Sequence, residues 1–175
     1  MESNGFLYVY DLVQDYLQHV SHATEFEPAL SKPAQVLRKV ASSLQDEVES
    51  NLRPYLDSLE IGSVDDARRI FSQVMEREFA DGQTNWGRIL TIFLFGGILT
   101  KKLQGCGVPL TKENLEEMSH FMTDYIVNTK AKWINENGGW DNGFVTKFED
   151  KGSWLSLHNV KSKVMAVFSF FTQYY

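Results

Sequence analysis

Apolar residues recur along this chain at helical spacing, three or four positions apart, with polar residues between them. One segment departs from this alternation, because nearly every residue between Arg88 and Lys101 is apolar. A run of about a dozen residues is well short of the roughly 20 needed to cross a bilayer. A helix that is apolar on all sides needs neighbours on all sides. The pattern therefore predicts that this segment is the buried central helix of the fold.

Amphipathic stripes predict further helices on both sides of the central one. Ser63 and Thr111 have the residue types that cap helix N-termini, and Asp65 and Asp66 then suit the positive end of a helix dipole. Pro54 is expected to break or restart its helix. The pair Gly138-Gly139 is expected to stop the chain before one short helix at 140–148. The stripes cover residues 9–20, 36–48, 67–79, 115–126 and 154–171.

No segment shows the alternation of a strand, and no internal repeat occurs. The 175 residues fit one domain. The sequence therefore predicts a single all-α domain over residues 1–175. We expect a mobile loop near 21–33, where two prolines interrupt the periodicity, and an amphipathic C-terminal helix near 154–172.

The formal charge of −6 and the pI near 5.2 argue against nucleic acid as the partner, since phosphate binding requires a basic surface. The first residues lack the cationic region of a secretory signal. Cys106 is the single cysteine, so no disulfide can form within the chain. Both features fit a reducing compartment.

The sequence offers no recognisable catalytic or metal-binding arrangement. The four histidines and Cys106 do not have the spacing of zinc or iron ligands, and there is no phosphate-binding glycine loop or nucleophile elbow. We therefore expect no metal, no cofactor and no enzymatic activity. A helical enzyme or small-ligand carrier, the alternative from a different class, lacks the residues it would need.

Two motifs carry a resemblance to a known family. Asn85-Trp86-Gly87-Arg88 stands before the apolar helix, and an Ile-x-x-Asn-Gly-Gly-Trp pattern runs from Ile134 to Trp140. With both motifs in this order, the chain resembles the B-cell lymphoma-2 family of apoptosis regulators, and its prosurvival branch in particular. Residues 37–48 and 9–20 fall where the family's third and fourth homology segments lie, so the resemblance covers nearly the whole chain.

The resemblance implies a bundle of about eight to nine helices around the central helix, with a surface groove. The groove would accept the amphipathic death helix of a pro-apoptotic relative. The implied function is to sequester such helices and prevent permeabilisation of the mitochondrial outer membrane, from the cytoplasm and in association with that membrane. The alternative is a pore-forming effector of the same fold, which would insert residues 89–99 and 115–126 into lipid; release of dye from liposomes separates the two.

The resemblance also implies which residues line the groove. Arg88 would pair with an aspartate of the partner helix, Asn85 would assist, and Gly87 would let the partner backbone approach closely. For the aliphatic members, ordinary core packing is the alternative. We expect Arg88→Ala to weaken peptide binding while leaving the melting temperature nearly unchanged. The groove candidates are Val48, Leu52, Tyr55, Val74, Glu78, Asn85, Gly87, Arg88, Thr91 and Phe95.

One departure from the family bears on its role. The family's partner segment reads Leu-x-x-x-Gly-Asp, but here Ala41 and Ser42 stand at the last two positions after Leu37. The chain lacks the aspartate that an Arg88-type groove would bind, which favours a receiver of death helices over a donor. We therefore expect Leu37, Val40 and Leu44 to be buried in the bundle.

The tail at 164–171 is too short for an ordinary transmembrane anchor. Lys161 and Lys163 precede it. The sequence is compatible with a helix lying on the membrane or folded against the bundle, and does not choose between them.

Overall fold

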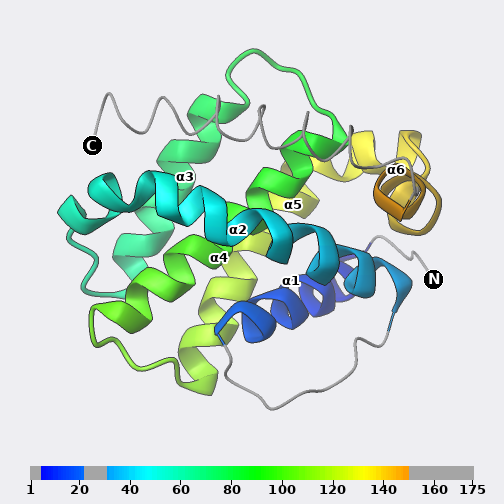
Figure 1. The fold of residues 1–175 in the computed structure, drawn as a ribbon. Coiled ribbons are helices and arrows are strands. Elements are labelled where there is room, and N and C mark those ends of the chain that lie inside the picture. The colour runs from blue at the N-terminus through cyan, green and yellow to red at the C-terminus, as the bar shows by residue number, and fades with distance from the viewer. Residues whose placement is uncertain (1–4, 22–30, 150–175) are drawn as a thin grey trace.

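The computed structural model describes residues 5–21 and 31–149, and these ranges contain helices and no strand. The predicted all-α class is confirmed. Six α-helices and one π-helix fall within these ranges, whereas eight to nine helices were expected, and the helix expected near 154–172 lies outside them. The elements are α1 (Phe6–Ser21), α2 (Lys32–Ser58), α3 (Val64–Glu78), α4 (Trp86–Gly105), α5 (Lys112–Glu136), the π-helix Gly139–Phe144 and α6 (Val145–Glu149) (Figure 1).

Helix α4 is the buried centre, as its apolar run predicts. Every residue from 89 to 100 is buried, and Phe93, Phe95 and Leu99 have no exposed surface. Helices α1, α2, α3 and α5 all contact α4, and α2 crosses in front of it in Figure 1. Among the described residues, no helix combines the length and the hydropathy needed to cross a membrane.

The predicted N-caps are confirmed. The Ser63 hydroxyl accepts a hydrogen bond from the Asp66 amide at 3.2 Å, and the Thr111 hydroxyl accepts one from the Asn114 amide at 3.1 Å. The burial of the third homology segment is also confirmed, since Leu37, Val40 and Leu44 are at most 4% exposed. That face of α2 is therefore part of the core.

The prediction that Pro54 breaks its helix is wrong, because α2 continues through it to Ser58. A proline inside a helix costs about 3 kcal/mol. Leu52 and Leu56 are buried on either side of it, and each such side chain contributes about 1.5 to 3 kcal/mol. Tertiary packing therefore outweighs the local penalty in this last turn.

The segment between the first two helices is shorter than the loop expected at 21–33. Ser21 is the last residue of α1, and Lys32 and Pro33 already belong to α2. The Ser31 hydroxyl caps this helix by accepting from the Ala34 amide at 3.2 Å, and proline is well tolerated in a first helical turn. Residues 22–30 lie outside the described ranges.

The short helix expected at 140–148 is instead a π-helix followed by α6. Gly138 and Gly139 have positive φ angles of 93° and 67°, which turn the chain after α5. A Cβ atom on Gly143 would lie 2.2 Å from the Asn137 carbonyl oxygen and 2.6 Å from the Trp86 ring. The glycines therefore let the π-helix backbone approach Trp86 closely.

The two sequence motifs pack against each other in space. The ring centroid of Trp86, from the first motif, lies 5.8 Å from that of Trp140 and 5.0 Å from that of Trp133. Phe144 completes the cluster, 5.8 Å from Trp86. These tryptophans therefore fix the start of α4 against the end of α5, and thereby position the neighbouring Arg88.

Candidate functional site

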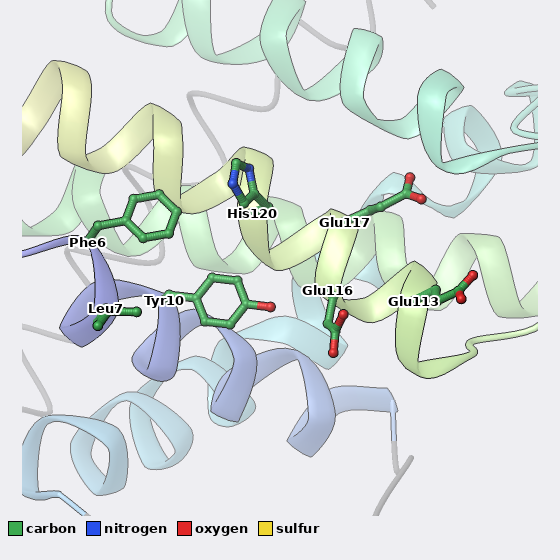
Figure 2. Close-up of a pocket in the computed structure, with 7 residues that line it drawn as sticks. All are labelled: Phe6, Leu7, Tyr10, Glu113, Glu116, Glu117 and His120. Atoms are coloured by element: carbon green, nitrogen blue, oxygen red, sulfur yellow. The ribbon is translucent and has the colours of Figure 1, made fainter.

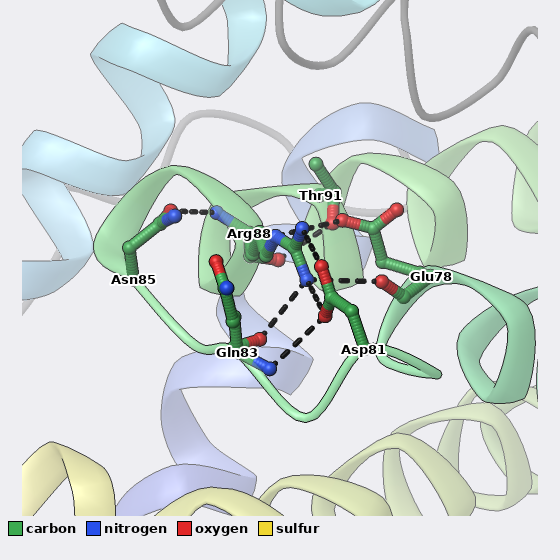
Figure 3. Close-up of polar contacts among 6 residues, drawn as sticks. All are labelled: Glu78, Asp81, Gln83, Asn85, Arg88 and Thr91. Carbon is green, nitrogen blue, oxygen red and sulfur yellow. Dashed lines mark hydrogen bonds and ion pairs between the residues drawn. The ribbon is translucent and has the colours of Figure 1, made fainter.

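The candidate site is the N-terminal turn of α4 and the loop that leads into it from α3 (Figure 3). The Asn85 side chain caps α4 by accepting a hydrogen bond from the Arg88 amide at 2.9 Å. Arg88 itself stands in the first turn, where the helix dipole disfavours a cation. An arginine in this position needs acceptors from elsewhere in the chain.

Those acceptors come from the preceding loop. Arg88 Nη1 donates to Asp81 Oδ1 at 2.6 Å and Nη2 donates to Asp81 Oδ2 at 2.7 Å, so the carboxylate binds both ends of the guanidinium fork. Nη1 also donates to the carbonyl oxygens of Glu78 and Gln83, at 3.2 Å and 3.0 Å. The hydrogen bonds from Arg88 hold the pKa of Asp81 at about 2, well below its usual value.

Two of the five donor hydrogens of Arg88 have no acceptor among the described residues. They are the Nε hydrogen and one Nη2 hydrogen, which together form the side-on edge of the guanidinium. Nε lies 3.7 Å from Glu78 Oε1, too far for a hydrogen bond. The internal partners therefore occupy one edge of Arg88 and leave the other edge unsatisfied.

Glu78 is the second unsatisfied group at this site. Its side chain is 4% exposed, and its Oε1 atom has no hydrogen-bond partner among the residues that the structure describes. Burial raises the pKa of Glu78 to about 7, while the nearby Arg88 acts in the opposite direction. Unpaired buried polar atoms are costly, and they often mark functional positions.

Lys130 of α5 contributes to the same charge environment. Its Nζ atom lies 3.6 Å from the centroid of the Phe79 ring, a cation–π contact. Burial lowers the pKa of Lys130, and Arg88 lowers it further. The site therefore combines the two cations with the ionised Asp81 and with Glu78, whose pKa of about 7 lets it be protonated near neutral pH beside an incoming carboxylate.

The ten predicted groove residues fall into two groups. The structure brings Glu78, Asn85, Arg88 and Thr91 together at the start of α4, where the Thr91 hydroxyl donates to the Arg88 carbonyl at 2.5 Å. The others line α2, α3 and α4, and nearly all are closed off from solvent. Val48, Leu52, Val74, Gly87 and Phe95 are buried, and Tyr55 is half-buried.

Gly87 has a local role that sequence reasoning missed. A Cβ atom there would lie 3.2 Å from Asn85 Oδ1, the atom that caps α4. A larger residue would crowd that cap, which is a reason for glycine independent of any partner. Close approach of a partner backbone stays a prediction.

Asp81 and Gln83 were also missed as members of the site. Asp81 precedes Gly82, whose φ of 73° bends the loop back toward α4. An acidic residue seven positions before an arginine at a helix start, with a glycine between them, is the signal that could have identified the pairing.

Among the described residues, no group of histidine, cysteine, aspartate or glutamate is arranged to hold a metal ion.

Comparison with known proteins shows the family of the chain. The family model of the apoptosis regulator proteins, Bcl-2 family, matches residues 37–140, a range that contains both sequence motifs. The chain belongs to the Bcl-2 family. The resemblance predicted from the two motifs is thereby confirmed.

Individual members of the Bcl-2 family are similar over most or all of the chain. Bcl-2-related protein A1 of Bos taurus is 46% identical over 175 residues, covering 100% of both chains. The anti-apoptotic protein NR13 of Coturnix japonica is 29% identical over 164 residues, covering 91% of this chain and 87% of its own. A zebrafish pro-survival protein, NRZ, solved in a complex with Bad BH3, is 25% identical with a TM-score of 0.61, over 81% of this chain and 92% of that one.

Proposed function

We propose that this chain is a prosurvival apoptosis regulator that binds the amphipathic death helix of pro-apoptotic relatives and so prevents permeabilisation of the mitochondrial outer membrane. The names of the similar proteins support the prosurvival direction: one is an A1 protein, one is called anti-apoptotic, and one is a pro-survival protein in a complex with Bad BH3. The lack of an aspartate at Ser42 supports a receiver over a donor of death helices.

The unsatisfied edge of Arg88 is the observation that carries this proposal. Asp81 and two backbone carbonyls hold the guanidinium in place, and the Nε hydrogen and one Nη2 hydrogen have no hydrogen-bond acceptor within residues 5–21 and 31–149. A carboxylate from a partner helix binds such an edge with two parallel hydrogen bonds. Glu78, with a pKa of about 7, can be protonated beside that carboxylate and so avoid repulsion.

The apolar candidates belong to the same proposal. Val48 and Leu52 of α2, Val74 of α3 and Phe95 of α4 are buried in the core, and the partner's apolar anchors would reach them only if the helices around them move. Each apolar side chain buried contributes about 1.5 to 3 kcal/mol. The anchors would therefore supply most of the affinity, and Arg88 would select partners that carry the carboxylate.

The site of action that we propose is the cytoplasm, in association with the mitochondrial outer membrane. Membership of a family of apoptosis regulators supports this location. Cys106 is exposed and unpaired, which is compatible with a reducing compartment.

Fluorescence polarisation with two labelled peptides tests the proposal. One is a death-helix peptide with its aspartate, and the other has asparagine there. We expect Arg88→Ala to weaken the aspartate peptide about ten- to a hundred-fold, which corresponds to about 1.4 to 2.7 kcal/mol. Arg88→Lys should lose part of this affinity, because an ammonium keeps the positive charge but cannot donate the two parallel hydrogen bonds that a guanidinium donates to a carboxylate.

The asparagine peptide is the control. It should bind the unmodified chain weakly, and Arg88→Ala should change its affinity little. An equal loss for both peptides would contradict the pairing with the carboxylate. Because Arg88 also donates hydrogen bonds to Asp81 and to the loop carbonyls, we expect its removal to lower the melting temperature by a few degrees rather than to leave it nearly unchanged. Dye release from liposomes by the activated protein would contradict the prosurvival direction.

A further inference from the structure

A second surface lies away from the Arg88 site, where the beginning of α1 meets the first turns of α5 (Figure 2). These two helices pack along each other, and a hollow of about 520 Å³ opens beside their contact. Neither α3 nor α4, which build the Arg88 site, contributes to it. The hollow is lined by Phe6, Leu7, Tyr10, Glu113, Glu116, Glu117 and His120.

The α1 side of the hollow is apolar. Leu7 is 77% exposed. No other large aliphatic or aromatic side chain is exposed in the parts of the chain that the structure describes. The Phe6 ring lies 5.3 Å from the His120 ring and 6.1 Å from the Tyr10 ring, between centroids. Figure 2 shows the Tyr10 ring reaching from α1 toward α5. The hollow is therefore lined by the packed rings of Phe6, Tyr10 and His120 beside the exposed side chain of Leu7.

The α5 side of the hollow is acidic. Glu116 and Glu117 follow Glu113 by three and four positions, so each is a neighbour of Glu113 on the surface of the helix. Glu113 is in the first turn, where the helix dipole accounts for a carboxylate, but Glu116 and Glu117 lie beyond it. None of the three forms an ion pair with a residue in the described ranges. In Figure 2, Glu116 points toward α1.

This arrangement differs from two other acidic clusters in the described ranges, whose carboxylates form ion pairs with nearby cations. Asp65 and Asp66 pair with the arginines that follow them, and Glu49 pairs with Lys101. Burial raises the pKa of Tyr10, and Glu116 and Asp11 raise it further, which shows that the negative field extends onto α1.

We propose that this hollow is a docking site for a cationic amphipathic helix of a partner protein. An apolar side chain of the partner would cover Leu7 against Phe6 and Tyr10, and its lysines or arginines would meet the three glutamates. An anionic membrane surface would be repelled by the same carboxylates. The hollow would bind cationic side chains, whereas the Arg88 site would bind a carboxylate. The two surfaces would therefore bind different helices.

The probe for this site is a helical peptide of about 15 residues, fixed by side-chain staples and composed of leucine, lysine and glutamine. A second peptide replaces every lysine with glutamate. Binding is measured by fluorescence polarisation on the full chain, and the site is mapped by amide chemical shifts. We expect the lysine peptide to bind at least about tenfold more tightly than the glutamate peptide, with shifts concentrated at residues 6–10 and 113–120.

Two variants and a matched control locate the interaction. Glu116→Gln combined with Glu117→Gln should weaken the lysine peptide about three- to thirty-fold, and Leu7→Ser about tenfold. Asp57→Asn combined with Glu136→Gln removes the same charge from exposed positions elsewhere. This control should change the affinity less than about twofold.

An equal effect of the control pair would overturn the proposal, because it would show only attraction to the net charge of −6. Shifts centred on Arg88 would also overturn it, as would equal binding of the two peptides. The death-helix peptide should bind the Glu116 and Leu7 variants unchanged. Failure of the lysine peptide alone would therefore refute this site and leave the proposed function intact, and failure of the death-helix peptide alone would do the reverse.

Discussion

The first turn of α4 and the middle of α4 differ sharply although they belong to one continuous helix. From residue 89 to residue 100 every side chain is buried, and the polar groups there are satisfied, as when the Thr100 hydroxyl donates to the Gly96 carbonyl at 2.8 Å. At its start, two donor hydrogens of Arg88 have no hydrogen-bond acceptor in the described part of the chain, and Oε1 of the nearby Glu78 has no hydrogen-bond donor there.

This difference separates stability from recognition. The middle of α4 supplies the core on which four other helices pack, so its substitutions should act on the free energy of unfolding. The beginning of α4 carries groups whose hydrogen bonds are incomplete within the chain, so its substitutions should act mainly on partner binding and on pH dependence. The following predictions test that division, from the largest expected effect to the smallest.

The first concerns Phe95, which is fully buried. Phe95→Ala should lower the free energy of unfolding by about 3 to 5 kcal/mol, because it leaves a cavity in the centre of the bundle. The melting temperature should then fall by roughly 6 to 20 °C in differential scanning calorimetry. A fall no larger than that caused by Arg88→Ala would contradict the division between the first turn and the middle of α4.

The second compares adjacent glycines of α4. A Cβ atom on Gly97 would lie 2.7 Å from Gln45 Oε1, which accepts a buried hydrogen bond from the Tyr16 hydroxyl. Gly97→Ala must displace that pair, so we expect a loss of about 1 to 3 kcal/mol in chemical denaturation.

Gly96→Ala is the matched control. Its Cβ atom would meet the end of the Met122 side chain at 2.3 Å. That flexible thioether can move more readily than the hydrogen-bonded glutamine and tyrosine. A larger loss for Gly96→Ala than for Gly97→Ala would show that the Tyr16–Gln45 contact is not the constraint.

The third uses pH to examine the start of α4. Burial raises the pKa of Glu78 from 4.5 to about 7, so the folded chain holds this proton more tightly than the unfolded chain. Its contribution to stability is complete below the unfolded value and is lost as the pH rises through about 7. Glu78→Gln has no such proton, so its melting temperature relative to the unmodified chain should rise by a few degrees between pH 5 and pH 8.

Glu76→Gln serves as the control for this measurement, because Glu76 is an exposed glutamate on the same helix. It should show no comparable change in relative melting temperature over that range. A constant difference between Glu78→Gln and the unmodified chain at both pH values would show that Glu78 is ionised in the same way in the folded and unfolded states.

The local patterns of the sequence determined the helices and their buried faces. The stripe from Val9 to Val20 became α1 with its apolar residues inside, and the run after Arg88 became the buried centre. Ser63 and Thr111 started helices because a cap depends only on residues within one turn. The two motifs identified the family because they are specific combinations of residues in a fixed order.

Only the tertiary structure decided the features that join distant residues. Pro54 stayed within α2 because Leu52 and Leu56 are buried against the bundle, an energy that no local propensity contains. The partners of Arg88 depended on how the loop at Asp81 folds back onto α4, and the raised pKa of Glu78 depended on burial by neighbouring helices. The sequence specified the helices and their caps, because these depend on residues within a few positions of each other. Packing between helices specified which polar groups lack a hydrogen-bond partner in the described part of the chain.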